Sequence, residues 1–432
     1  MLYWLYRLIG SALFFLFYPI LLLIIRFQSH DGPGLRQRIG LVPPLDPPGK
    51  GCTARVWIHA ASVGEVGAAS VLIRELAAAG EALDFVVTTM TVDGLRVAGK
   101  KLPEHVNCLL APLDVPWVAR RVINTIRPDI YACLETELWP ALLAELRKAG
   151  VRAVLLNGRV TERSFIWYAL GRSLFGPLLS GFSEIAVIRG EDGERFTRLG
   201  VDGGRIRVTG NMKYDFPDED TEAVRRKYRK ILRVGGEEVF VCGSTRTDEE
   251  KILLDVYRQL AALRDRKVVW VIAPRHLKRL PEVLSLLTDR GLGYDLYTEL
   301  AGRGRSHDVV VVDCLGELSR LYSAGDYNFV GGSLADRGGH NIMEAARWGR
   351  PVYYGRGLKD FSDAADLLER YGAGFRIADG NELAAVILGH MRERTAYEQA
   401  CRNAVRAAAT QRGAARKQAS IILGLLEEKR EN

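Results

Sequence analysis

Short apolar runs alternate with helical stretches along most of this chain, and that alternation limits the fold more than any other feature. Thirteen runs read as buried strands: Val56–His59, Phe85–Thr89, Cys108–Leu110, Ile130–Leu134, Ala153–Asn157, Ile185–Ile188, Ile206–Thr209, Val239–Cys242, Val268–Ala273, Val309–Val312, Asn328–Val330, Pro351–Tyr354 and Gly374–Ile377. Strands that alternate with helices form a mostly parallel sheet covered by helices on both faces. The sequence therefore predicts an α/β fold.

The alternation pauses once, at the highly charged segment Tyr214–Lys230. We interpret this pause as the crossing between two doubly wound domains of similar size, because exposed polar segments commonly separate domains. The predicted boundaries are 29–212 and 236–397 for two Rossmann-like domains, 213–235 for the linker and 398–432 for a helical tail rich in Ala and Arg. Two such domains facing a cleft constitute the GT-B arrangement.

The first 28 residues predict a membrane anchor. Leu8–Ile25 carries no charge and lies between Arg7 and Arg26. Eighteen helical residues would span about 27 Å, close to the thickness of a hydrocarbon core. Pro19 would kink this helix, so the sequence leaves open whether it crosses the bilayer or lies in the interface. A signal peptide is the alternative, but no small-x-small cleavage site follows.

The net charge limits the kinds of partner that this chain would bind, and the cysteines and histidines indicate its compartment and metal binding. With 60 Lys and Arg against 52 Asp and Glu, the formal charge is +8, which suits a nucleotide, a membrane surface or a phosphorylated lipid. No zinc-finger or RNP-like motif supports a nucleic-acid partner. The six cysteines form no C-x-x-C pair, which indicates free thiols in a reducing compartment. The histidines show no metal-ligand spacing, so we expect no metal site.

The stretch Trp57–Glu65 carries the first candidate chemistry. A strand ends at His59, and Glu65 follows at the start of the next helix. Ligands of open parallel sheets lie beyond the carboxyl ends of the strands, so we predict that Glu65 is a catalytic base. Glu135 and Glu137 follow another strand, where one carboxylate would assist catalysis and the other would accept a hydrogen bond from a neighbour; a purely structural role is the alternative. Lys213 ends a further strand and could meet an acidic sugar.

Glycines and cations at strand ends in the second half predict a nucleotide site. Gly243–Arg246, Ala273–His276 and the Gly331–Ser333 stretch each follow an apolar run, and Gly338–Asn341 opens a helix. Free backbone N–H groups and Arg side chains bind phosphate, and Glu344 could accept hydrogen bonds from ribose hydroxyls. The predicted nucleotide-binding residues are Ser244, Thr245, Pro274, Arg275, His276, Leu315, Gly316, Glu317, Gly331, Gly332, Ser333, Asn341, Ile342, Met343 and Glu344. Ordinary capped turns are the alternative for each stretch.

Taken together, these stretches resemble one family, the 3-deoxy-D-manno-octulosonic acid (Kdo) transferases of lipopolysaccharide biosynthesis. The matching pieces are the anchor, His59–Glu65, Glu135–Pro140, Gly210–Lys213, Ala273–His276, Gly331–Ser333 and His340–Glu344. The resemblance implies transfer of Kdo from CMP-Kdo to the lipid A precursor on the cytoplasmic face of the inner membrane, without a metal or other cofactor. It also implies the roles of proton acceptor for Glu65 and transition-state stabiliser for Glu135, and CMP binding for Pro274, Arg275, Leu315–Glu317 and Asn341–Glu344. From their positions beside these residues we also expect support from Glu137, and sugar or acceptor binding by Ser62, Gly64, Lys213 and Arg246.

The expected mechanism is an inverting displacement, and it contains one physical difficulty. A carboxylate at a helix N-terminus has a lowered pKa, which weakens Glu65 as a base. Two other functions remain open from the residues alone. One is a GT-B glycosyltransferase or epimerase that uses a UDP-sugar, and the other is a membrane-tethered nucleotide-binding module without turnover.

Overall fold

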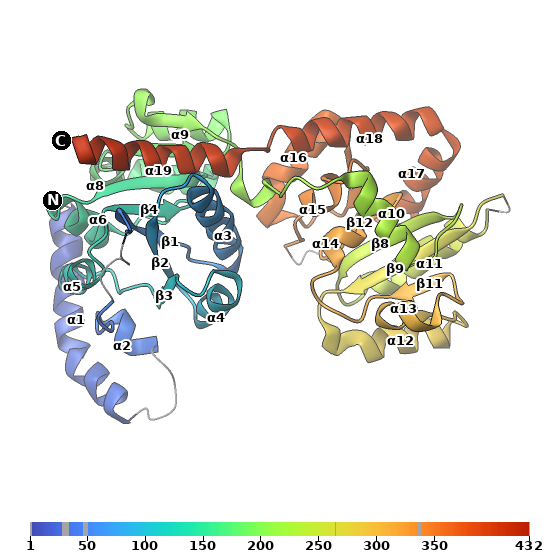
Figure 1. Ribbon diagram of the computed structural model, residues 1–432, viewed down its shortest axis with the longest axis horizontal. Helices are drawn as coiled ribbons and strands as arrows, with labels where there is room; N and C mark the ends of the chain where they lie inside the picture. The colour runs from blue at the N-terminus through green and yellow to red at the C-terminus, as the bar shows by residue number, and fades with distance from the viewer. Residues whose placement is uncertain (1, 28–33, 46–50, 264, 336–337, 432) are drawn as a thin grey trace. The chain divides into compact units, whose positions relative to one another are not determined.

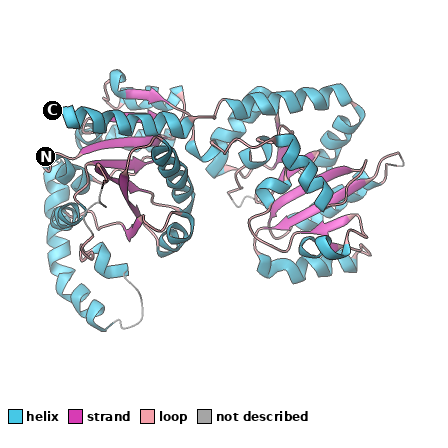
Figure 2. Cartoon of the chain, in the orientation of Figure 1, coloured by secondary structure: helices cyan, strands magenta, loops and turns pink. Residues whose placement is uncertain are grey.

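The computed structural model describes residues 2–27, 34–45, 51–263, 265–335 and 338–431. The chain forms two compact units, one of residues 1–215 with 413–432 and one of residues 216–412 (Figure 1). The sequence also predicts a linker or loop over residues 43–51, and part of this stretch lies outside the described residues. The α/β prediction is confirmed, since each unit holds a central parallel sheet with helices around it (Figure 2).

The sheet of the first unit has seven parallel strands in the order β3-β2-β1-β4-β5-β6-β7. They are β1 (Ala54–His59), β2 (Leu83–Thr89), β3 (Asn107–Leu110), β4 (Ile130–Leu134), β5 (Arg152–Gly158), β6 (Glu184–Val187) and β7 (Ile206–Val208). The helices of this unit are α1 (Leu2–Phe27), α2 (Gly34–Arg38), α3 (Val63–Ala78), α4 (Val92–Lys101), α5 (Pro116–Ile126), α6 (Pro140–Lys148), α7 (Glu162–Leu170), α8 (Arg172–Leu179), α9 (Gly190–Arg198) and α19 (Ala414–Glu431).

Both faces of this sheet are buried, which explains the continuous apolar runs of the sequence. Val56 and Ile58 of β1 pack in a core with α3, α4 and α19. Trp57, between them on the strand, points to the other face and packs in a second core with α5, α6, α8 and α9. Successive residues of a strand point to opposite faces, so one six-residue strand contributes to two cores.

The second unit has a related topology, with seven parallel strands in the order β10-β11-β9-β8-β12-β13-β14; it differs at one edge, where β11 lies between β10 and β9. They are β8 (Glu238–Thr245), β9 (Val268–Pro274), β10 (Asp295–Leu296), β11 (Val309–Val311), β12 (Tyr327–Val330), β13 (Val352–Tyr354) and β14 (Gly374–Arg376). Its helices are α10 (Thr221–Ile231), α11 (Glu249–Ala261), α12 (Leu280–Asp289), α13 (Leu300–Arg303), α14 (Leu318–Leu321), α15 (Met343–Ala346), α16 (Ser362–Tyr371), α17 (Gly380–Arg392) and α18 (Arg394–Ala409).

The structure differs from the sequence prediction in several local elements. The charged segment expected as a linker contains α10, which begins after the capping residue Asp220 and belongs to the second unit. The predicted tail is divided, because α18 belongs to the second unit and α19 packs on α3 of the first (Figure 1). The sequence pattern also predicts a helix over Asn341–Trp348, and its predicted length is wrong, because α15 has only four residues.

The expected apolar helix at the N-terminus is present as α1. Within it, Trp4–Leu21 is long and apolar enough to cross a membrane, and only 6% of that window is buried. Pro19 lies inside the helix.

Candidate active site

The strand order of each sheet indicates the edge at which that unit would bind a ligand. In the first sheet the order reverses between β1 and β4, and in the second between β8 and β12. Open α/β sheets bind ligands beyond the carboxyl ends of the strands at such a switch point. Ser62, Gly64, Glu65 and Glu135 follow β1 and β4, so the topology brings these predicted residues to one point.

Glu65 lies in the first turn of α3 and is 5% exposed. Ser62 caps the helix, and its hydroxyl donates to Glu65 Oε1 at 2.8 Å. The backbone N–H of Ala61 donates to Glu65 Oε2 at 2.8 Å. These contacts form a reciprocal cap of the kind that fixes a helix start. Each carboxylate oxygen is therefore oriented while retaining a lone pair for a substrate hydroxyl.

Glu135 and Lys213 form an ion pair beside Glu65. Glu135 has a positive φ of 56°, and its backbone N–H donates to Leu156 O at 2.8 Å. The Lys213 ammonium donates to Glu135 Oε1, and both side chains are about one-quarter exposed. Gly64 lies against the same ammonium, since a Cβ at this position would be 3.6 Å from Lys213 Nζ. The cluster thus contains two carboxylates and one cation.

This environment raises the pKa of Glu65 from 4.5 to about 7. Burial is the largest cause and the negative charge of Glu135 is the second, while the hydrogen bonds from Ser62 and Ala61 and the charge of Lys213 act in the opposite direction. A base with a pKa near neutral pH transfers protons efficiently. The helix start alone would have made Glu65 a weak base, and its surroundings supply the opposing effect.

Glu137 lies farther along the same loop and is partly exposed. Its pKa is raised, first by burial and then by the charge of Glu135. Its backbone carbonyl accepts from Cys133 Sγ at 3.0 Å. Behind the loop, His59 is buried and its Nδ1 lies 3.0 Å from Thr88 Oγ1. Burial lowers the pKa of His59 to about 4, so this imidazole is neutral.

A buried amide network, which sequence reasoning missed, holds the loop that carries Lys213. Gln418 of α19 is fully buried; its Oε1 accepts from Asn157 N at 2.9 Å and its Nε2 donates to Thr209 Oγ1 at 2.9 Å. Asn157 in turn accepts from Met212 N at 2.9 Å and donates to Asn211 Oδ1. Asn157-Gly158 and Gly210–Lys213 were visible as strand ends, but nothing local in the sequence points to Gln418.

In the second unit, a buried carboxylate occupies the glycine-rich loop after β12. Glu249 is 1% exposed and accepts from the backbone N–H groups of Gly332, Ser333 and Leu334 at 2.7, 3.1 and 3.0 Å. It also accepts from Arg246 N at 2.9 Å. These N–H groups point to a side chain of the protein, so the loop is a rigid support rather than a ready-made phosphate cradle.

Four basic side chains gather near this support. Arg246 follows β8, Arg275 and His276 follow β9, and His340 precedes α15. Arg246 Nη1 lies 2.9 Å from His276 Nε2. Burial, followed by the charges of Arg275, Arg246 and His276, lowers the pKa of His340 to about 4. An anionic group placed here would relieve this mutual repulsion.

The other predicted nucleotide-binding residues lie around the same sheet edge. Thr245 is fully buried and its hydroxyl donates to Glu250 Oε1 at 3.0 Å, while Ser244 has a φ of 56°. Leu315 is 74% exposed, and Glu317 accepts from Tyr228 Oη at 2.7 Å. Gly316 is exposed and has a positive φ of 96°. The remaining positions are partly or fully buried: Pro274, Ile342, Met343, Asn341 and Glu344. Their binding roles stay predictions.

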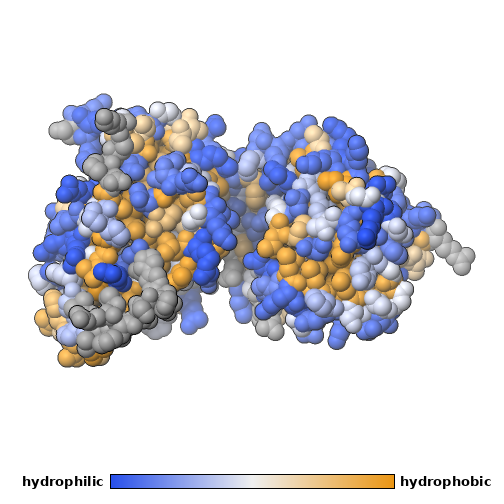
Figure 3. Space-filling view, turned by 60° about the horizontal axis from the view of Figure 1, so that its bottom comes forward, coloured by the Kyte–Doolittle hydropathy of each residue, from blue (hydrophilic) through white to orange (hydrophobic). Residues whose placement is uncertain are grey.

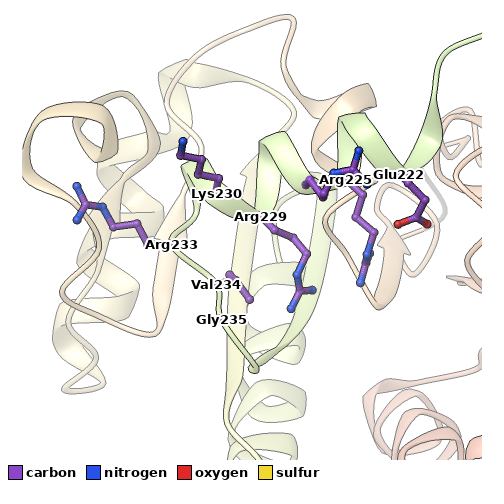
Figure 4. Close-up of a pocket in the computed structure, with 8 residues that line it drawn as sticks. Glu222, Arg225, Arg229, Lys230, Arg233, Val234 and Gly235 are labelled. Carbon is purple, nitrogen blue, oxygen red and sulfur yellow. The ribbon is translucent and has the colours of Figure 1, made fainter.

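A separate cavity of about 520 Å³ lies along α10 and contains none of the predicted site residues (Figure 4). Arg225 and Arg229 line it, and both pair with Asp326 at 2.6 and 3.1 Å.

Among the residues that the structure describes, no group of three His, Cys, Asp or Glu side chains has the arrangement of a metal site.

Residues 33–216 match the family model described as 3-deoxy-D-manno-octulosonic-acid transferase (kdotransferase). A 3-deoxy-D-manno-octulosonic acid transferase of Chlamydophila psittaci is 34% identical over 373 residues, which cover 84% of this chain and 83% of that protein. The chain belongs to the Kdo transferase family.

Two further comparisons add a second relative and the fold. A bifunctional glycosyltransferase/methyltransferase of Fusobacterium nucleatum is 31% identical over 77% of this chain, which spans about half of that relative's length, 52%. UDP-GlcNAc 2-epimerase of Neisseria meningitidis, solved with UDP-GlcNAc, aligns over 87% of the chain with a TM-score of 0.57 and 12% identity. This likeness shows the fold alone, and it agrees with the GT-B type predicted from the sequence. The chain thus combines membership of the Kdo transferase family with a GT-B fold.

Proposed function

We propose that this Kdo transferase moves Kdo from CMP-Kdo to the lipid A precursor lipid IVA, by inversion and without a metal, at the cytoplasmic face of the inner membrane. Membership of the family supports the sugar that is transferred. The observation that carries the chemical proposal is the buried Glu65, whose pKa lies near 7 beside the Glu135–Lys213 pair. A membrane-tethered binding module would not need a carboxylate poised in this way.

In the proposed reaction, Glu65 accepts the proton of the acceptor's primary hydroxyl as that oxygen attacks the anomeric carbon of Kdo. The bond between this carbon and the phosphate oxygen of CMP breaks at the same time, and CMP leaves with the electron pair. Attack from the face opposite the leaving group inverts the anomeric configuration. Ser62 and Ala61 keep the carboxylate oriented throughout.

Glu135 acts on this step through its charge. It contributes to the raised pKa of Glu65, and its negative charge would also favour the positive charge that develops on the sugar ring. Lys213 limits the repulsion between the two carboxylates and is the cation of this site that could meet the carboxylate of Kdo. Glu137, two residues farther along the loop, supports Glu135 and does not itself take part in the proton transfer.

In this proposal, the basic cluster of the second unit binds the phosphate of the leaving CMP. Arg246, Arg275, His276 and His340 are the cationic or donor side chains at the edge formed by β9, β8 and β12. Glu249 holds the neighbouring loop by three hydrogen bonds, so Gly331–Ser333 would bind the donor through shape and close backbone approach.

The test of the base is Glu65→Gln, assayed for CMP release and for the lipid product by mass spectrometry with CMP-Kdo and tetraacyl lipid A precursor. General-base removal is expected to lower turnover by about 10²–10⁴-fold, with CMP-Kdo binding retained. Glu75→Gln, on the same helix, is the matched control and is expected to keep its activity. A fully active Glu65→Gln enzyme would refute the assignment. Stabilisation of the protein by UDP but not by CMP in a thermal-shift comparison would refute the donor.

A further inference from the structure

Helix α1 does not stand apart from the protein but packs along the first unit by one face. Phe14 is 6% exposed, and its ring centroid lies 5.9 Å from that of Trp117 on α5. Tyr18 lies 5.8 Å from the same ring, and Leu21 packs in the same cluster. Together with Tyr6, these residues recur every three to eight positions on one face, so the covered stripe extends over about 23 Å of helix.

A polar contact fixes the N-terminal part of α1. Tyr6 Oη donates to Asp114 Oδ2 at 2.6 Å. The same carboxylate accepts from Ala141 N and Leu142 N at 3.0 and 2.8 Å, at the start of α6. The helix is therefore attached at both ends of the covered stripe, by a hydrogen bond at Tyr6 and by aromatic packing at Phe14 and Tyr18.

Over the part of α1 whose side chains the structure describes, most of the remaining surface is apolar and exposed. Figure 3 shows hydrophobic surface at the lower left, the side on which Figure 1 draws α1. Large apolar side chains of α1 that are about half or more exposed are Trp4, Leu5, Leu8, Ile9, Leu13, Phe15, Leu16, Phe17 and Ile20. An interfacial helix normally turns a polar face away from the lipid. Here the contact with α5 and α8 takes the place of that polar face.

The docked arrangement is incompatible with a helix that crosses the bilayer. Arg121 lies one turn beyond Trp117, and its guanidinium lies 5.6 Å from the centre of that ring. Trp117 contacts the middle of α1, so a crossing α1 would carry Arg121 to the depth of the hydrocarbon core. Arg120, exposed beside it and paired with Glu145, would follow. Charged side chains at that depth are strongly disfavoured.

A second apolar face lies on α7 of the same unit. Ile166, Trp167 and Leu170 are 57%, 64% and 75% exposed and share one face by their spacing. No residue of α7 is buried. Helix α8 contacts both α1 and α7, so the two apolar faces belong to the same part of the unit. A lipid leaflet is the partner whose chemistry fits two adjacent apolar helix faces.

We propose that α1 is a monotopic anchor: it lies within one leaflet, docked on α5 and α8, with the apolar face of α7 entering the same leaflet. Both ends of α1 then remain on the side of the membrane that holds the two units. This inference rests on the proposed membrane attachment but not on the proposed reaction, because topology can be measured without turnover.

The deciding experiment is the location of the N-terminus. The full chain carrying an epitope tag at either end is expressed in a Gram-negative host, and inverted inner-membrane vesicles are treated with protease. We expect the N-terminal tag to be digested as fast as the C-terminal tag. An N-terminal tag that is protected until detergent is added would show that α1 crosses the membrane and would overturn the proposal.

The contribution of α7 is tested by tryptophan quenching in vesicles whose acyl chains are brominated near the headgroup. Trp167→Phe is expected to lose part of the quenched emission of the wild-type protein. Trp348→Phe, which removes a tryptophan that is 3% exposed in the second unit, serves as the control and is expected to keep all of it. Equal quenching in wild type and Trp167→Phe would place α7 outside the leaflet and overturn this part of the proposal.

Discussion

Replacing Glu65 by Gln should stabilise the protein by an amount that grows with pH, even though it removes the proposed base. Folding raises the pKa of Glu65 from 4.5 to about 7. One pKa unit corresponds to 1.36 kcal/mol, so the ionised carboxylate costs the folded state about 3 kcal/mol. Glutamine has no proton to lose in this range and therefore avoids the cost.

The sign follows from which state binds the proton. Below pH 4.5 both the folded and the unfolded chain hold it, and Glu65 causes no pH dependence. Between 4.5 and about 7 the unfolded chain releases the proton first, so the wild-type protein loses stability as the pH rises. Above about 7 both states are ionised and the cost is complete. Glutamine also keeps an oxygen that can accept from Ala61 N, so the helix start should remain intact.

The assay is urea unfolding of the full chain in detergent, for wild type and Glu65→Gln, at intervals from pH 5 to pH 8. The difference in unfolding free energy between the two should grow in favour of the variant by about 2–3 kcal/mol over this range. Glu75→Gln controls for the loss of one carboxylate from α3. A difference that does not change with pH would refute the raised pKa, and one that grows in favour of wild type would reverse its sign.

Three further outcomes follow from the site. Gln418→Leu leaves buried amide groups without partners and should lower the unfolding free energy by about 2–4 kcal/mol in urea; a loss below 1 kcal/mol would contradict the network's role. Lys213→Met removes a charge that lowers the pKa of Glu65, so the rising limb of the pH–rate profile should move to higher pH, and an unmoved limb would contradict this coupling. Glu249→Ala removes the acceptor that holds three backbone N–H groups, so the loop loses its rigid support and calorimetry should show weaker CMP binding. An affinity for CMP equal to that of the wild-type protein would contradict this role.

Much of the fold could be predicted from the local pattern of the sequence. β1 has six residues that are all buried, and a strand buried on both faces is mostly apolar. Its exception near the start is Arg55, whose charge is paired with Asp84. Turns of small residues between such runs then predict helices that cross from one parallel strand to the next. The short α15 shows the limit of this reasoning: Asn341–Trp348 has a helical pattern, but the chain turns after Ala346 to feed β13.

The sequence by itself determined which residues stand at strand ends, including Glu65, Glu135, Arg275 and Lys213, because strand ends are marked by local composition. Only the tertiary structure decided which of these ends are neighbours, since strand order depends on pairing between distant segments. It also decided that Gln418 of the last helix supports the first unit. The basicity of Glu65 belongs to the same class of property, because desolvation and the charge of Glu135 arise only when the chain has folded around the carboxylate.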